Sequence, residues 1–236
     1  MPHPFLLLFD IDATLLKTGG AGMNAMALVA AQLFGKPFKW DGINASGSLD
    51  PVIFAQAAAI NEIINDDDNH SRFRDHYIAE LDRQIAANLH TFQILPGVHE
   101  LLAKLRQRET TKRDIILGLL TGNYTQAVPV KFKYANLDQT WFSITAFGDE
   151  APSRPELVAL AMKKFELVHG HAPDPRRIII IGDTPRDVDC AKAHGCICIA
   201  VATGGYTADE LHACGADHVL ADLSDATVLW GLIDQV

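Results

Sequence analysis

The sequence predicts an α/β protein: a Rossmann-like, doubly wound, mostly parallel sheet with an all-helical cap domain inserted into it. Two observations support this prediction. Short apolar runs alternate with stretches of helical spacing, which is typical of a parallel sheet with helices on both faces. Residues 17–92 interrupt this alternation, because they show helical spacing and contain no convincing buried strand.

Six apolar segments predict the strands of the core. They lie near residues 5–10, 115–121, 143–147, 177–182, 196–201 and 217–220. Helical patterns fall between these segments, for instance over 155–168 and 185–194. We therefore assign residues 1–16 and 93–236 to the α/β core.

Residues 17–92 are predicted to form the helical cap. The segment Gly19–Gly22 precedes its helices and predicts a flexible hinge, and Leu95–Gly97 marks the return to the core. The acidic stretch Asp66–Asn69 lacks the ligand spacing of a calcium loop, so we interpret it as a solvated loop. Helical spacing covers three segments, Met23–Phe34, Pro51–Ile64 and Ser71–Asn88.

The charge of the chain restricts its partners. The 236 residues carry a formal net charge of -9, which disfavours nucleic acid and anionic membrane surfaces because both require a basic footprint. No apolar run approaches the roughly 18 residues needed to span a bilayer. Asp10 and Asp12 interrupt the N-terminal apolar run, which argues against a signal peptide. We expect a cytoplasmic protein; its oligomeric state is open, and a monomer is compatible with the sequence.

The cysteines allow two interpretations. Cys190, Cys196, Cys198 and Cys214 show no disulfide framework, which favours a reduced setting. The first three, together with His194, raise the alternative of a zinc site. They fall in core helix and strand patterns, however, so buried thiols are the favoured interpretation.

Asp10 and Asp12 are the most informative pair in the chain. They follow the apolar run Phe5–Phe9, so they lie at the C-terminal end of a predicted buried strand, where a near-extended backbone points both side chains the same way. Two crowded carboxylates repel each other unless a cation neutralises them or one holds a proton. Either solution is chemically useful, because a metal-bound carboxylate can attack an electrophile and a protonated one can act as general acid.

Three further segments extend this pattern. Thr121–Asn123 follows the second predicted core strand, Arg154 precedes Pro155 at the start of a predicted helix, and Asp183 follows the strand Ile178–Gly182. In this order the four segments resemble the motifs of the haloacid dehalogenase superfamily, and the chain is most similar to its phosphoglycolate-phosphatase-like branch. The resemblance spans nearly the whole chain and implies phosphatase activity under a cap that closes over the active site.

The two first aspartates receive different roles. We interpret Asp10 as the nucleophile that forms an aspartyl phosphate and Asp12 as the general acid and base. The resemblance implies the same division and adds that the backbone carbonyl of Asp12 reaches the metal. It also implies that Asp12 disfavours a dehalogenase, since displacing a halide needs no acid. Ala13 departs from the usual glycine of the family, and alanine tolerates positive φ poorly; Thr14 is predicted to buttress the turn.

Thr121 would hold the phosphoryl group with its hydroxyl. Gly122 permits close backbone approach, Asn123 is a second substrate contact, and N–H groups at the start of a following helix would add a positive field. A plain helix N-cap is the alternative for Thr121.

Arg154 would neutralise the transferring phosphoryl group and orient Asp10. Many family members carry lysine at this position. The alternative is a surface arginine beside Pro155, and Lys131 and Lys133 are rival donors, although both fall mid-helix.

Asp183 is a hard oxygen ligand at a strand end and suits Mg²⁺. Asp187 lies one helical turn further and either holds a metal-bound water or acts as a first-turn acid on the helix dipole. The predicted magnesium site therefore comprises Asp10, Asp12, Asp183 and Asp187, and the cation would offset the repulsion between Asp10 and a phosphoryl group.

The polar loop Asn44–Asp50 is the candidate specificity loop, with Ser46 and Ser48 as substrate contacts; an ordinary capped turn is an equal alternative. The sequence predicts a Mg²⁺-dependent phosphatase of a small phosphomonoester. A phosphomutase of the same fold is the main alternative, and a non-catalytic binding protein or a dehalogenase is less favoured.

Overall fold

A six-stranded parallel sheet forms the centre of the computed structural model, which describes residues 4–36 and 38–234. The strand order is β5-β4-β1-β6-β7-β8, and every neighbouring pair is parallel. The strands are β1 (Phe5–Phe9), β4 (Ile115–Leu120), β5 (Ile144–Ala146), β6 (Ile178–Gly182), β7 (Ile197–Val201) and β8 (His218–Leu220). All six predicted strands are therefore confirmed.

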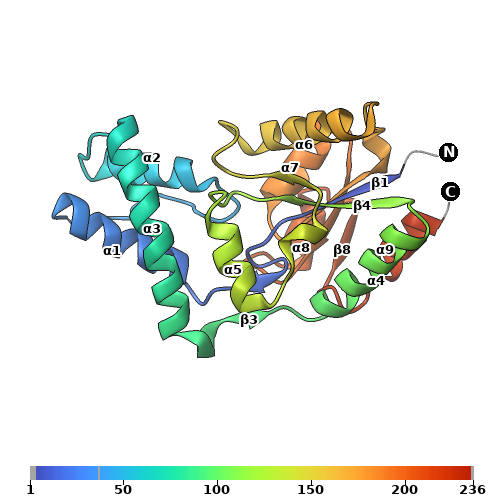
Figure 1. Cartoon of the computed structure of the whole chain (residues 1–236), viewed down its shortest axis with the longest axis horizontal. Helices are drawn as coiled ribbons and strands as arrows, with labels where there is room; N and C mark the ends of the chain where they lie inside the picture. Colours follow the sequence, from blue (N-terminus) through green and yellow to red (C-terminus); the bar gives the residue numbers. More distant parts are fainter. Residues whose placement is uncertain (1–3, 37, 235–236) are drawn as a thin grey trace.

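Helices cover both faces of this sheet (Figure 1). The core helices are α4 (Val98–Thr111), α5 (Ala127–Ala135), α6 (Arg154–His169), α7 (Pro185–His194), α8 (Ala208–Ala213) and α9 (Thr227–Asp234), and short 3-10 turns span Leu89–Thr91, Gln139–Trp141 and Pro175–Arg177. Figure 1 shows α6 and α7 on one side of the sheet and α4 and α9 on the other. The doubly wound α/β fold is thus confirmed.

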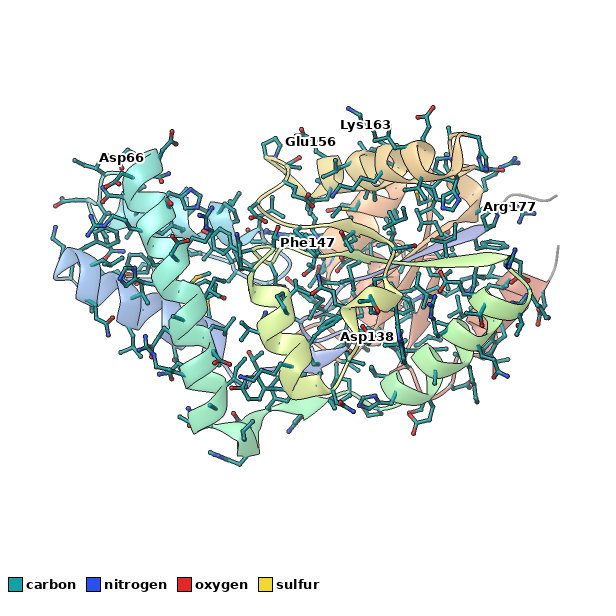
Figure 2. The ribbon with its side chains drawn as sticks, viewed as in Figure 1. Asp66, Asp138, Phe147, Glu156, Lys163 and Arg177 are labelled. Carbon is teal, nitrogen blue, oxygen red and sulfur yellow. The ribbon has the colours of Figure 1, made fainter. Side chains whose placement is uncertain are left out.

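The alternation of β1 explains why both faces are covered. Leu6 and Leu8 pack into the cluster beneath α6 and α7, whereas Leu7 and Phe9 pack into the cluster beneath α4 and α9. A strand buried on both faces is uniformly apolar, as parallel strands between two helical layers are. On α6, the exposed residues Glu156 and Lys163 point away from the sheet (Figure 2).

Three helices lie together at one end of the sheet, at the left of Figure 1. They are α1 (Ala21–Phe34), α2 (Asp50–Ile60) and α3 (Asp67–Ala87), and they bury a separate aromatic core that contains Phe54, Phe73 and Tyr77. A two-stranded antiparallel ribbon, β2 (Leu16–Lys17) with β3 (Gln93–Ile94), frames this block. The division into a core of residues 1–16 and 93–236 and a cap of residues 17–92 stays our prediction, and the block is called the helical cap below.

Two local expectations need correction. Gly19 and Gly20 have positive φ, but Ala21 and Gly22 already belong to α1, so the predicted hinge is shorter than expected. The acidic stretch 66–69 begins α3 instead of forming a solvated loop. Asp66 caps the helix by accepting the Asn69 N–H at 2.8 Å, and it lies at the outer end of α3 (Figure 2). Acidic residues in a first turn also stabilise the positive end of the helix dipole.

Two further expectations concern the cysteines and the membrane. Cys190, Cys196 and Cys198 are free thiols packed in the core, and Cys214 is free and half-buried. Within residues 4–36 and 38–234, none of the helices has the length and apolar character that crossing a bilayer requires.

Candidate active site

The candidate site lies where the sheet topology reverses. The strand β1 is flanked by β4 on one side and β6 on the other, and ligands of open parallel sheets bind beyond the carboxyl ends of the strands at such a point. A cavity of about 210 Å³ opens there between the sheet and the helical cap. The predicted residues that line it are Asp10, Asp12, Ser46, Ser48, Thr121, Gly122, Asn123, Arg154 and Asp183. The fold therefore brings nine of the ten predicted site residues to one cavity.

Asp10 is a buried carboxylate in a strongly negative environment. Its backbone N–H donates to the carbonyl of Ile181 at 2.9 Å, which fixes the residue at the end of β1. Burial raises the pKa of Asp10 to about 6; Arg154, 3.0 Å away, opposes this, and Asp187 adds to it. Burial is the largest cause of this shift, and the attraction of Arg154 does not cancel it.

Asp187 is the one predicted residue behind the cavity wall. It is fully buried, and both its oxygens are already engaged. One accepts the N–H of Thr184 at 3.0 Å and its hydroxyl at 2.7 Å in a capping box, and the other accepts Arg154 at 2.5 Å. Asp187 therefore caps the start of α7 with one oxygen, and with the other oxygen it orients the guanidinium of Arg154. The other end of Arg154 donates to the carbonyl of Gly47 at 3.1 Å.

Asp10, Asp183 and Asp187 offer carboxylate oxygens that lie within 4.8 Å of one another. Burial raises the pKa of Asp183 to about 8, and the charges of Asp10 and Asp187 add to this effect. Clustered carboxylates at this spacing fit a divalent cation with oxygen ligands, such as Mg²⁺. Because the oxygens of Asp187 are occupied, Asp10 and Asp183 are the carboxylates available for direct coordination.

Two neighbours fix the carboxylate of Asp183. The hydroxyl of Thr14 lies 3.5 Å from Oδ1, so the predicted buttress of the turn also reaches the metal site. A Cβ at Gly204 would lie 1.8 Å from Oδ2 of Asp183, so only glycine leaves room for this carboxylate.

Asp12 belongs to a polar network that the motif did not reveal. Lys131 donates to both carboxylate oxygens of Asp12, at 2.8 and 2.6 Å, and also to Oδ1 of Asn123. The amide nitrogen of Asn123 donates to Asp12 at 2.7 Å and to the hydroxyl of Thr121 at 2.7 Å. The side chain of Asn123 thus orients Asp12 and Thr121, and Lys131, predicted as a rival of Arg154, is instead the partner of Asp12.

The residue after Asp12 adopts a strained conformation. Ala13 has a φ of 56°, the region in which a non-glycine residue costs about 1–2 kcal/mol. The hydroxyl of Thr203 donates to its carbonyl at 2.5 Å and helps to hold this turn. The replacement of the usual family glycine by alanine therefore carries a conformational cost.

The helix that follows Thr121, α5, begins only at Ala127, so the alternative that Thr121 is its N-cap is wrong. Gly122 is needed for a different reason: a Cβ there would lie 2.0 Å from the carbonyl of Ser48, and the Gly122 carbonyl accepts the N–H of Asp50 at 2.7 Å. At this point the loop of the helical cap crosses the end of β4.

The loop 44–50 was interpreted either as a specificity loop or as an ordinary capped turn, and it has features of both. It is a turn in which the N–H of Ser48 donates to the carbonyl of Ala45 at 3.0 Å, and it also lines the cavity with Ser46 and Ser48. Asp50, the last residue of the predicted specificity loop, lines the cavity too, and so does Tyr77, which was not predicted as a site residue. Tyr77 belongs to the buried stripe of α3, a pattern that places it in the core of the cap but does not distinguish it as a site residue.

Lys131 could have been found from the sequence. The buried residues of α5 are Ala127, Val128, Lys131, Phe132 and Ala135. This lysine stands inside the apolar stripe of an amphipathic helix, where a charge requires a buried partner.

Curated proteins and a solved structure resemble this chain. The phosphoglycolate phosphatase of Synechococcus elongatus is 29% identical over 148 residues, and this match covers 63% of the chain and 64%, slightly less than two thirds, of that protein. The phosphoglycolate phosphatase of Aliivibrio fischeri is 27% identical over 213 residues, or 87% and 86% of the two chains. The crystal structure of CbbY from Rhodobacter sphaeroides in complex with phosphate superposes with a TM-score of 0.72 at 20% identity, over 94% and 96% of the chains.

These relatives agree with the predicted superfamily and with its phosphoglycolate-phosphatase-like branch. The family model described as haloacid dehalogenase-like hydrolase matches residues 7–201, a span that contains Asp10, the helical cap, Thr121 and Asp183. The chain therefore belongs to the haloacid dehalogenase-like hydrolases.

Proposed function

We propose that this protein is a Mg²⁺-dependent phosphatase that hydrolyses a small phosphomonoester through an aspartyl phosphate on Asp10. The observation that supports this most is the convergence of Asp10, Asp12, Arg154 and Asp183 on one small cavity at the end of the central strand. The net charge and the free cysteines agree with our prediction of a cytoplasmic enzyme without nucleic-acid or membrane partners.

In the first step, an oxygen of Asp10 attacks phosphorus and the bond from phosphorus to the ester oxygen breaks. Arg154, held by Asp187 and 3.0 Å from Asp10, orients the nucleophile and adds positive charge beside the transferring group. The protonated carboxyl of Asp12 gives its proton to the departing oxygen, which leaves as an alcohol.

In the second step, water attacks the phosphorus of the aspartyl phosphate. Asp12, now a carboxylate, takes the proton of that water, and the bond between Asp10 and phosphorus breaks to release phosphate. Lys131 and Asn123 hold the Asp12 carboxylate in place, and Thr121 lines the same cavity.

Asp10 and Asp183, with the backbone carbonyl of Asp12 that the family resemblance adds, would hold the Mg²⁺. When bound, it would supply the positive charge that offsets the repulsion between Asp10 and the phosphoryl group.

The test is phosphate release from 4-nitrophenyl phosphate and small alkyl phosphates, measured with Mg²⁺ and with EDTA. We expect release that requires Mg²⁺ and falls at least about 10³-fold in Asp10→Asn, whose folding is verified by circular dichroism. No release by the wild-type protein under any condition would contradict a phosphatase. A phosphoryl group returned to another position of a sugar phosphate, without free phosphate, would identify a phosphomutase instead.

A further inference from the structure

The part of the cavity that would receive the leaving group lacks an available cation. It is lined by residues of the helical cap: Thr18, Met23, Met26, Ser46, Asp50 and Tyr77. These residues offer hydroxyl groups, apolar side chains and one carboxylate. Among the described residues that line the cavity, the cations are Lys131 and Arg154, and both belong to the sheet side.

Both of these cations are already engaged. The three N–H groups of Lys131 meet the two oxygens of Asp12 and the side-chain oxygen of Asn123. Arg154 bridges Asp10 and Asp187 and donates to the carbonyl of Gly47. Lys17 lies outside this cavity, in an adjoining pocket that shares Thr18, Ser46 and Asp183 with it. Within the lining of the cavity itself, a negative charge on the leaving group would therefore meet no cation that lacks an anionic partner.

Asp50 would repel such a charge. It is buried, and its Oδ2 accepts the backbone N–H of Tyr124 at 2.9 Å. Burial raises the pKa of Asp50 to about 7, so it is mostly ionised at pH 8. Burial and the charge of Asp50 raise the pKa of Tyr77, so its hydroxyl remains a hydrogen-bond donor beside this carboxylate. A donor, an acceptor and a carboxylate in a small cavity suit hydroxyl groups.

We propose that this cavity selects phosphomonoesters with a small, hydroxyl-bearing leaving group that has no negative charge, and discriminates against a leaving group that carries a carboxylate or a second phosphate. The volume of about 210 Å³ lies below the usual range of ligand sites and limits the leaving group to a few carbons. This inference rests on the proposed phosphatase activity. It separates the chain from its phosphoglycolate phosphatase relatives, because the substrate in their name carries a carboxylate.

The test uses three two-carbon esters that differ at one end only: 2-hydroxyethyl phosphate, 2-phosphoglycolate and phosphoethanolamine. Initial rates are measured at pH 8 with Mg²⁺, and 4-nitrophenyl phosphate reports the basal reaction. We expect kcat/KM for 2-hydroxyethyl phosphate to exceed that for 2-phosphoglycolate by at least about tenfold, because binding a carboxylate here leaves it without a counter-charge. Phosphoethanolamine, whose ammonium group would be attracted by the carboxylate of Asp50, should also exceed 2-phosphoglycolate.

Two variants test the cause of this preference. Asp50→Asn keeps an oxygen for the Tyr124 N–H and removes the charge, so the ratio between the hydroxyethyl and carboxylate esters should fall several-fold. Asp41→Asn, an exposed position of the helical cap, is the matched control and should leave the ratio unchanged. Ser46→Lys introduces a cation at a half-buried lining position and should shift the ratio toward 2-phosphoglycolate.

The possible outcomes distinguish a failure of the proposed selectivity from a failure of the proposed phosphatase activity. No release from any ester, 4-nitrophenyl phosphate included, overturns the phosphatase itself. Release from the aryl ester with 2-phosphoglycolate as the preferred alkyl ester overturns only the proposed selectivity. An unchanged ratio in both Asp50→Asn and Ser46→Lys, each verified as folded, would show that the lining of the cap does not set the preference.

Discussion

Gly204 and Asp183 are so close that the identity of one residue controls the position of the other. A Cβ at Gly204 would fall 1.8 Å from the Asp183 carboxylate, so Gly204→Ala must displace this proposed metal ligand. We expect the apparent Mg²⁺ affinity to fall about 10- to 100-fold, as it does when groups that orient a ligand are lost. Titration calorimetry with Mg²⁺, alongside the metal dependence of activity, measures the change.

Gly205→Ala is the matched control, because a Cβ at that glycine would have no atom within 4 Å. It should bind Mg²⁺ as the wild-type protein does. If Gly204→Ala and the wild-type protein bind Mg²⁺ with equal affinity, Asp183 is not a ligand of the proposed metal site.

The role of Asp12 predicts a dependence on the leaving group. A general acid matters most when the departing alcohol is a poor leaving group, so Asp12→Asn should lower kcat/KM for an alkyl phosphate by about 10²–10⁴. The loss of kcat/KM, which does not include the second step that all esters share, should be much smaller with 4-nitrophenyl phosphate, whose phenolate leaves without a proton. Steady-state rates on the two esters provide the comparison, and equal losses on both would contradict an acid role for Asp12.

At the scale of elements, sequence patterns predict best the residues that come directly after a strand. Asp10, Thr121 and Asp183 each come after a strongly apolar strand, so their convergence is a consequence of parallel topology alone. The ribbon β2–β3 was not predicted, because two-residue strands carry no periodic signal. The engagement of both Asp187 oxygens was also beyond a linear pattern, since it depends on how α6 packs beside α7.

The helix α5 contributes Lys131, and its register predicts a contrast between two lysines. Lys131 points into the core and holds Asp12, whereas Lys133 is exposed and pairs with Asp82 at 2.9 Å. Lys131→Met should lower kcat on alkyl phosphates about 10- to 100-fold, because a misplaced general acid is costly even at the scale of 1 Å. Lys133→Met removes an exposed pair, which contributes at most about 1 kcal/mol, and should leave kcat unchanged.

A merely structural role for Lys131 would lower the rates on alkyl and aryl esters alike. A positioning role through Asp12 predicts instead that Lys131→Met adds little to the loss already caused by Asp12→Asn. The double-mutant cycle measures this coupling, because residues in one hydrogen-bonded network are not additive. If the losses of rate caused by the two substitutions are fully additive, Lys131 does not act through Asp12.

At the scale of the whole molecule, the helical cap and the α/β core are joined at the active site. The Asp50 N–H donates to Gly122, the carboxylate of Asp50 accepts Tyr124, and His70 of α3 lies 2.8 Å from the hydroxyl of Tyr124. Gly47 accepts Arg154 in the same region. Because the cavity walls come from both parts, contacts that hold them together also set the shape of the site.

This junction makes the stability of the molecule depend on pH through Asp50. Its pKa is about 7 in the folded protein and near 3.8 when unfolded, so the folded state binds the proton more tightly. Asp50 should therefore lower the free energy of unfolding as pH rises from about 4 to about 7, and the full cost, roughly 4 kcal/mol at most, persists above that range. Asp50→Asn removes the titration and still accepts the Tyr124 N–H. Urea denaturation in EDTA should show the variant gaining stability over the wild type between pH 5 and pH 8, whereas a constant difference would mean that Asp50 ionises normally in the folded state.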